Sequence, residues 1–126
     1  MQHRTFWHMF FMLTLSMSFC YFIKVVFKNY GNINFNDDEF LTTVAASSFF
    51  CGASFRFIWG TVQDYIGFKR VYATILFFLT ILAFTLHEVG SRSRAFYQIW
   101  IGMIFAMEGG HFSIFPAVAC NIYGAQ

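Results

Sequence analysis

Charged residues are scarce in this sequence. Of its 126 residues, 11% are Asp, Glu, Lys or Arg and 58% are hydrophobic, whereas soluble domains carry about 25% charged residues. So few charges could not cover a surface that faces water, so we predict an integral membrane protein. Acidic residues are absent from the first 36 positions, a composition that weakly favours import into an organelle.

Cysteine pairs and concentrated positive charge are also missing. The three cysteines are an odd number without paired spacing, which favours neither a disulfide framework nor a zinc site. The formal net charge is +2 and comes from scattered cations, so nucleic acid is not an expected partner. No nucleophile, base and orienting group recur at a usable spacing. We therefore expect no enzyme activity, no cofactor and no metal site.

What the chain does have is long apolar stretches. A membrane-spanning helix needs about 20 mostly apolar residues, and four runs approach that length, at about 6–27, 40–62, 71–87 and 96–123. We predict an all-α fold with four transmembrane helices in a single transmembrane domain, 1–126. Because the number of spans is even, both ends of the chain should lie on the same side of the membrane.

The first connection has the composition of a loop. Asparagines, Gly31 and a run of acids fill positions 29–39, and these residue types favour loops and the first turn of a helix. We expect the first helix to end before this segment, with Lys24 and Lys28 close to the membrane surface.

Glycine and proline distinguish the later runs. Gly109, Gly110 and Pro116 in the fourth run predict a broken or kinked helix. The second run is rich in small residues, which let helix backbones approach closely inside a membrane, so we expect this helix to be packed on more than one side. Aromatic residues near the predicted helix ends are expected to anchor at the lipid headgroups; they are Trp7, Trp59, Trp100 and Tyr97.

Deep inside the predicted spans lie the ionisable residues Arg56 and Glu108, with His111 as a third candidate. Intramembrane charges are expensive and are treated by default as functional. In one interpretation Arg56 binds an anion while Glu108 or His111 couples protons. In the other, Arg56 and Glu108 satisfy each other or a partner chain. His111 follows Glu108 by three residues, so the two share a helix face, but without a third ligand they do not make a metal site.

A short polar hairpin joins the second and third runs in the pattern G-x-x-x-D-x-x-G-x-K-R. Gly60 permits close packing at the helix end, and Asp64 can cap a helix or pair with a cation. Gly67 allows a tight turn. Lys69 and Arg70 suit the headgroup region.

This hairpin resembles the signature loop of major facilitator superfamily transporters, with Tyr65 departing from the basic residue common after the aspartate. Arg56 and positions 108–117 resemble segments of the eighth and tenth helices in the oxalate:formate antiporter and monocarboxylate branch. The resemblance covers helices seven to ten of the family's C-terminal half. It implies that Gly60, Asp64, Gly67, Lys69 and Arg70 lie on the cytoplasmic or matrix side. It also implies that Arg56 faces a substrate carboxylate.

Two functional hypotheses follow from the resemblance. Major facilitators enclose their substrate path between two six-helix halves, and four helices of one half cannot do so. With the chain taken as complete, we expect a truncated, non-transporting accessory subunit of a larger complex, in contact with other membrane proteins and lipids. An organelle membrane, the mitochondrial inner membrane, is the expected location. The alternative is a fragment or component of a secondary active transporter for small carboxylates, with Arg56, Glu108 and His111 binding substrate.

Overall fold

The computed structural model of the chain describes residues 2–90 and 92–124. Its helices are α1 (Gln2–Phe35), α2 (Asp38–Ile66), α3 (Phe68–Gly90) and α4 (Arg94–Tyr123). The described residues contain no strand, and all four helices are long and apolar enough to cross a membrane. The predicted all-α fold with four transmembrane helices is confirmed, and the chain is an integral membrane protein.

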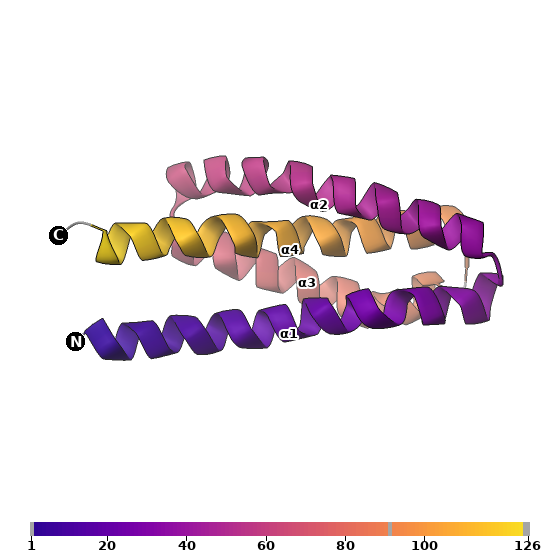
Figure 1. Cartoon of the computed structure of the whole chain (residues 1–126), viewed down its shortest axis with the longest axis horizontal. Coiled ribbons are helices and arrows are strands. Elements are labelled where there is room, and N and C mark those ends of the chain that lie inside the picture. Colours follow the sequence, from indigo (N-terminus) through magenta and orange to yellow (C-terminus); the bar gives the residue numbers. More distant parts are fainter. Residues whose placement is uncertain (1, 91, 125–126) are drawn as a thin grey trace.

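The fourth helix is the centre of the bundle. α1 and α2 lie on either side of α4, and α3 lies behind it (Figure 1). Within the most apolar stretch of each helix, 56% of the α4 residues are buried, against 22% in α1, 22% in α2 and 28% in α3. The chain ends lie at the same end of the bundle (Figure 1), as the even number of spans predicts.

The first connection is much shorter than expected. α1 continues to Phe35, because Gly31 fits against Leu41 and Tyr97 where a side chain would collide. The ring of Phe35 also packs on those of Phe40 and Tyr97, with centroids 5.8 and 5.5 Å apart. Tertiary packing therefore overrides the loop preference of the asparagines, and Lys24 lies inside the helix, not at its end.

Two residues turn the chain from α1 into α2. Asn36 adopts a positive φ of 47°, a region that asparagine tolerates better than most residues. The Asp37 carboxylate accepts a hydrogen bond from the Phe40 amide at 3.1 Å and caps α2. Its second oxygen lies 2.9 Å from the Arg94 guanidinium. The acids thus begin the second helix, as expected, and tie this turn to α4.

The predicted break in the fourth helix is absent. α4 runs without interruption through Gly109, Gly110 and Pro116. The glycines serve close packing instead. A Cβ at Gly109 would collide with the carbonyl oxygen of Gly52 on α2, and a Cβ at Gly110 would lie 2.5 Å from a methyl group of Ile75 on α3. The missing side chains therefore let two neighbouring helices approach α4.

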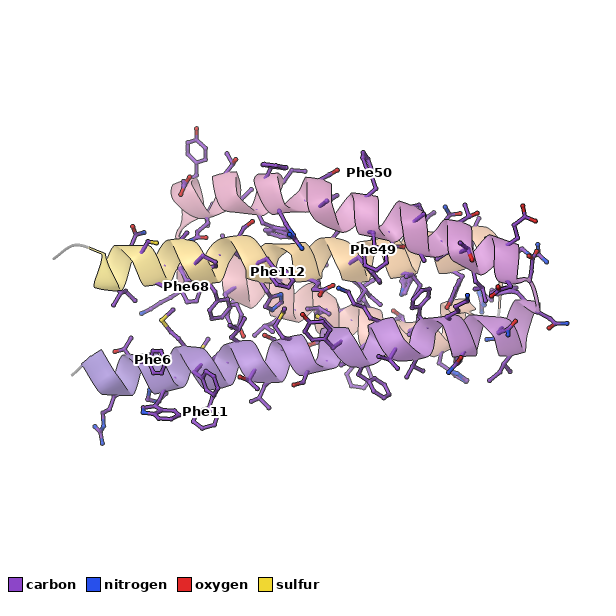
Figure 2. All side chains as sticks on the ribbon, in the orientation of Figure 1. Phe6, Phe11, Phe49, Phe50, Phe68 and Phe112 are labelled. Atoms are coloured by element: carbon purple, nitrogen blue, oxygen red, sulfur yellow. The ribbon has the colours of Figure 1, made fainter. Side chains whose placement is uncertain are left out.

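The expectation that α2 packs on more than one side is wrong for the described chain. The buried residues Val44, Ser48 and Gly52 lie along one side of α2, which packs chiefly on α4. Phe50 points away from the bundle (Figure 2), and its side chain is 76% exposed, that of Phe57 81%.

Three of the four expected aromatic anchors form hydrogen bonds to neighbouring helices. Tyr97 is fully buried, and its hydroxyl donates to the Phe27 carbonyl of α1 at 2.5 Å. The Trp59 indole donates to the Ala106 carbonyl of α4 at 3.1 Å. The Trp100 indole donates to the Thr85 hydroxyl of α3 at 3.0 Å. Only the Trp7 side chain, 52% exposed, keeps the surface position expected of an anchor.

Candidate anion-binding face

An ion pair joins α1 to α4 inside the apolar spans. The Lys24 ammonium lies 2.7 Å from Oε1 of Glu108, and the two side chains are 23% and 5% exposed. The contact is an ion pair by distance, although its angles are not those of a hydrogen bond. Opposite charges attract strongly where water is scarce, so this contact supplies the counter-charge that each group needs.

Aromatic rings surround the same ammonium group. Nζ of Lys24 lies 5.1 Å from the ring centroid of Phe105, 5.4 Å from that of Tyr21 and 5.6 Å from that of Phe49. A cation is attracted to the negative face of an aromatic ring within about 6 Å of its centroid. These rings therefore stabilise the lysine charge in surroundings where hydration is limited.

Arg56 is a second cation on the same side of α4. Its guanidinium carbon lies 4.6 Å from the ring centroid of Phe112, and its aliphatic stem passes Gly109. Its carbonyl accepts a hydrogen bond from the Ser113 hydroxyl at 2.6 Å. Among the described residues, no carboxylate forms an ion pair with Arg56. Glu108 pairs with Lys24, so the sequence alternative in which Arg56 and Glu108 pair with each other is not the arrangement in the structure.

His111 faces a different neighbour. Its side chain is 1% exposed, and its ring makes an edge contact with Tyr72 of α3 and stacks on Phe115, with centroids 5.9 and 6.3 Å apart. Nδ1 lies 3.3 Å from the Met107 carbonyl. Of the three predicted substrate-binding residues, Glu108 is in the ion pair, Arg56 contacts Phe112, and His111 packs against Tyr72 of α3.

These residues define the candidate site, which we call the α1–α2 face. Figure 2 shows Phe49 of α2 and Phe112 of α4 in the space between α1 and α2. With two cations and one carboxylate, the face carries an excess of one positive charge, so it is suited to an anion. The α1–α2 face comprises Lys24, Phe49, Arg56, Phe105, Glu108 and Phe112.

Lys24 is the residue that sequence reasoning missed. It was placed near the end of the first helix because the polar segment 29–39 has the composition of a loop. The apolar residues Val25, Val26 and Phe27 continue the run beyond it. The predicted span 6–27 therefore already contained Lys24, and this was the signal that a lysine inside the span could pair with Glu108.

The hairpin motif lies at a bundle end, away from the turn between α1 and α2. The connection between α2 and α3 is at the same end as both chain termini (Figure 1). Gly67 is the single residue between the helices, and its φ of 88° is one that residues with a Cβ rarely adopt. Asp64, Lys69 and Arg70 are exposed there, and Gly60 is half-buried. Their placement on the cytoplasmic or matrix side stays a prediction.

The chain is similar in sequence to a membrane carrier. It is 27% identical over 84 residues to Apicoplast pyruvate carrier 1 of Toxoplasma gondii. The match covers 67% of this chain but 15% of that carrier, so the chain corresponds to a small part of its length. No protein-family model matches the chain, and no solved structure matches it.

This similarity supports a transporter-like membrane protein. The relative is named as a carrier and not as an enzyme. The similarity does not confirm the resemblance to the major facilitator superfamily or to its oxalate:formate branch. It also gives no support to the non-transporting accessory subunit that the four-helix count favoured.

Proposed function

We propose that this chain is a component of a membrane transporter for small carboxylates, and that its α1–α2 face binds the anion. The observation that carries the proposal is the second cation. Glu108 balances Lys24, and Arg56 has no carboxylate partner among the described residues. An arginine within an apolar span needs a counter-charge, and a substrate carboxylate supplies one.

The chemistry of Arg56 suits a carboxylate. A guanidinium presents a planar fork of N–H donors that matches the two carboxylate oxygens. The Phe112 ring lies 4.6 Å from its central carbon, and a contact with a ring does not use up the N–H donors that a carboxylate needs. Because the Arg56 side chain is exposed within the described chain, an anion can reach it without displacing a protein carboxylate.

The Lys24–Glu108 pair gives this face a way to couple protons to anions. While Glu108 is ionised, it holds the Lys24 ammonium at 2.7 Å. A proton taken up by Glu108 removes that attraction and frees Lys24 to join Arg56 in binding the substrate. Entry of one proton with one monocarboxylate keeps the charge of the face unchanged, so the exchange avoids burying an uncompensated charge.

The surroundings of the face fit a larger transporter. The face is open between α1 and α2, and the chain matches only 15% of the pyruvate carrier, so we propose that further membrane helices and lipid complete the path. The family we propose is the major facilitator superfamily, in its monocarboxylate branch, and the location an organelle membrane such as the mitochondrial inner membrane. The similarity to an apicoplast pyruvate carrier supports both a monocarboxylate substrate and an organelle.

Pyruvate uptake tests the proposal. The chain is isolated from its native membrane with whatever proteins accompany it, and is reconstituted in liposomes. We expect Arg56→Gln to lower uptake by roughly tenfold to a hundredfold, because a hydrogen bond to a charged group contributes about 1.5–3 kcal/mol. Arg92→Gln is the matched control, since Arg92 is an exposed cation in the α3–α4 connection. Equal uptake by the two variants would show that Arg56 does not bind the substrate.

A further inference from the structure

A second feature borders the α1–α2 face and shares Phe112 with it. An apolar groove of about 540 Å³ runs between the first half of α1 and the second half of α4, and we call it the α1–α4 groove. Phe10, Leu13 and Met17 line it from α1, and Phe115 and Ala119 line it from α4. Small-molecule sites commonly enclose about 300–1,000 Å³. His111 is the polar residue among those that line the groove.

One ring nitrogen of His111 has a hydrogen-bond partner and the other has none among the described residues. Nδ1 lies 3.3 Å from the Met107 carbonyl oxygen. A carbonyl oxygen can only accept, so this partner assigns the proton of the neutral ring to Nδ1 and leaves a lone pair on Nε2. Nε2 is buried and has no hydrogen-bond partner among the described residues. The missing partner must therefore be a donor.

Tyr72 packs on the His111 ring, but its hydroxyl already donates a hydrogen bond elsewhere. The Tyr72 ring packs edge-on against the imidazole at 5.9 Å, but its hydroxyl donates to the Met12 carbonyl at 3.1 Å and lies 3.4 Å from the Ser16 hydroxyl. A buried polar atom without a partner costs about 1–3 kcal/mol. A bound molecule that donates a hydrogen bond to Nε2 would remove this cost. The rest of that molecule must be apolar, because the groove that holds it is apolar.

We infer that the α1–α4 groove binds a single hydrocarbon chain that ends in a hydrogen-bond donor, either an alcohol or an undissociated fatty acid. The terminal O–H donates to Nε2 of His111, and the hydrocarbon lies against Phe10, Leu13 and Phe115. An ionised carboxylate does not fit the neutral ring, because it offers Nε2 only acceptors. This ligand class separates the groove from the α1–α2 face, which suits an anion.

Photolabelling in lipid nanodiscs tests the site. The probe is dodecanol with a photoreactive diazirine on its chain, and mass spectrometry locates the labelled peptides. We expect labelling of α1 and α4 around Leu13 and Ala119. Unlabelled dodecanol should compete about three- to tenfold better than methyl dodecyl ether, which has the same apolar body without a donor. Dodecanoic acid should compete better when protonated than when ionised.

Two variants separate the groove from the histidine. Ala119→Trp fills the groove and should abolish labelling, whereas Ala53→Trp, on an exposed part of α2, should not change it. His111→Phe keeps a stacked ring but removes the acceptor, so alcohol and ether should then compete equally.

Two results would contradict binding of such a ligand in the groove, and the first can be obtained with the unaltered protein. If alcohol and ether compete equally in the unaltered protein, Nε2 is not the ligand's partner. If the groove is not labelled and Ala119→Trp disrupts a dimer or a complex, a protein helix occupies it. Neither result changes the uptake expected of Arg56→Gln, so this inference and the proposed transport function fail independently.

Discussion

α1 and α2 both pack on α4, but by different means. Along α2 the contact is between backbones, with Gly52 and Gly109 close together and the Phe105 carbonyl 3.0 Å from where a Cβ of Gly52 would lie. Along α1 the contacts include the Lys24–Glu108 ion pair, the Tyr97–Phe27 hydrogen bond and the packing of Phe35 on Tyr97, and part of the contact is replaced by the α1–α4 groove. Hydrogen bonds of Trp59 and Ser113 also join α2 to α4, so α2 is held more closely than α1. We call the close α2 contact the permanent seam and the looser α1 contact the adjustable side. The candidate anion site spans both contacts, since Lys24 lies on α1 and Arg56 on α2.

The largest expected effect comes from the permanent seam. Gly109→Ala should lower the free energy of unfolding by about 1–3 kcal/mol, because the new Cβ must push the α2 backbone away and overpacking costs this much. Gly102→Ala is the matched control, since its Cβ would lie 4.0 Å from the Ser48 hydroxyl. Denaturant titration in detergent micelles measures both. Equal stability would mean that α2 and α4 are not in close backbone contact.

The next largest effect is expected at the Lys24–Glu108 ion pair, on the adjustable side. Glu108→Gln leaves the Lys24 charge without its partner, and we expect a loss of about 1–2 kcal/mol in the same titration, less than for a fully buried pair because Lys24 is 23% exposed. Lys24→Met combined with Glu108→Gln should recover most of this loss, since no unpaired charge remains. Arg56→Gln should change the stability by no more than about 0.5 kcal/mol. A large loss there would make Arg56 structural.

The smallest effect is expected at the exposed end of the bundle. Arg94→Gln removes the 2.9 Å contact with Asp37, and a solvent-exposed ion pair contributes about 0–1 kcal/mol. Because salt screens exposed charges, the difference from the unaltered protein should shrink as sodium chloride is raised. The Lys24–Glu108 contribution should respond less. A reversed order of salt sensitivity would contradict the burial of the inner pair.

Sequence length and composition were enough to predict the helices but not their ends. Four apolar runs could only cross a membrane as helices, so the all-α prediction was secure. The end of α1 depended on whether Gly31 and Phe35 would find partners on α2 and α4. Local residue preferences contain no such information, and they predicted a loop.

The candidate site was predictable in its residue types and not in its pairings. Arg56 and Glu108 stood out because charges are rare in apolar spans. Which cation meets Glu108 depends on which side of α4 each neighbouring helix occupies, and Lys24 was set aside once the helix end was misplaced. His111 shares a helix with Glu108, yet its ring packs on Tyr72 of another helix.

The central position of α4 has a consequence for how the protein is made. Helices enter the membrane in chain order, so α1, α2 and α3 are present before the helix on which all three pack. Until α4 arrives, the glycine side of α2 has no neighbour and Lys24 has no carboxylate. Insertion of α4 therefore joins the four described helices in one step, and a chain stalled before Arg94 would present Lys24 without Glu108 and an uncovered α2 seam to membrane quality control.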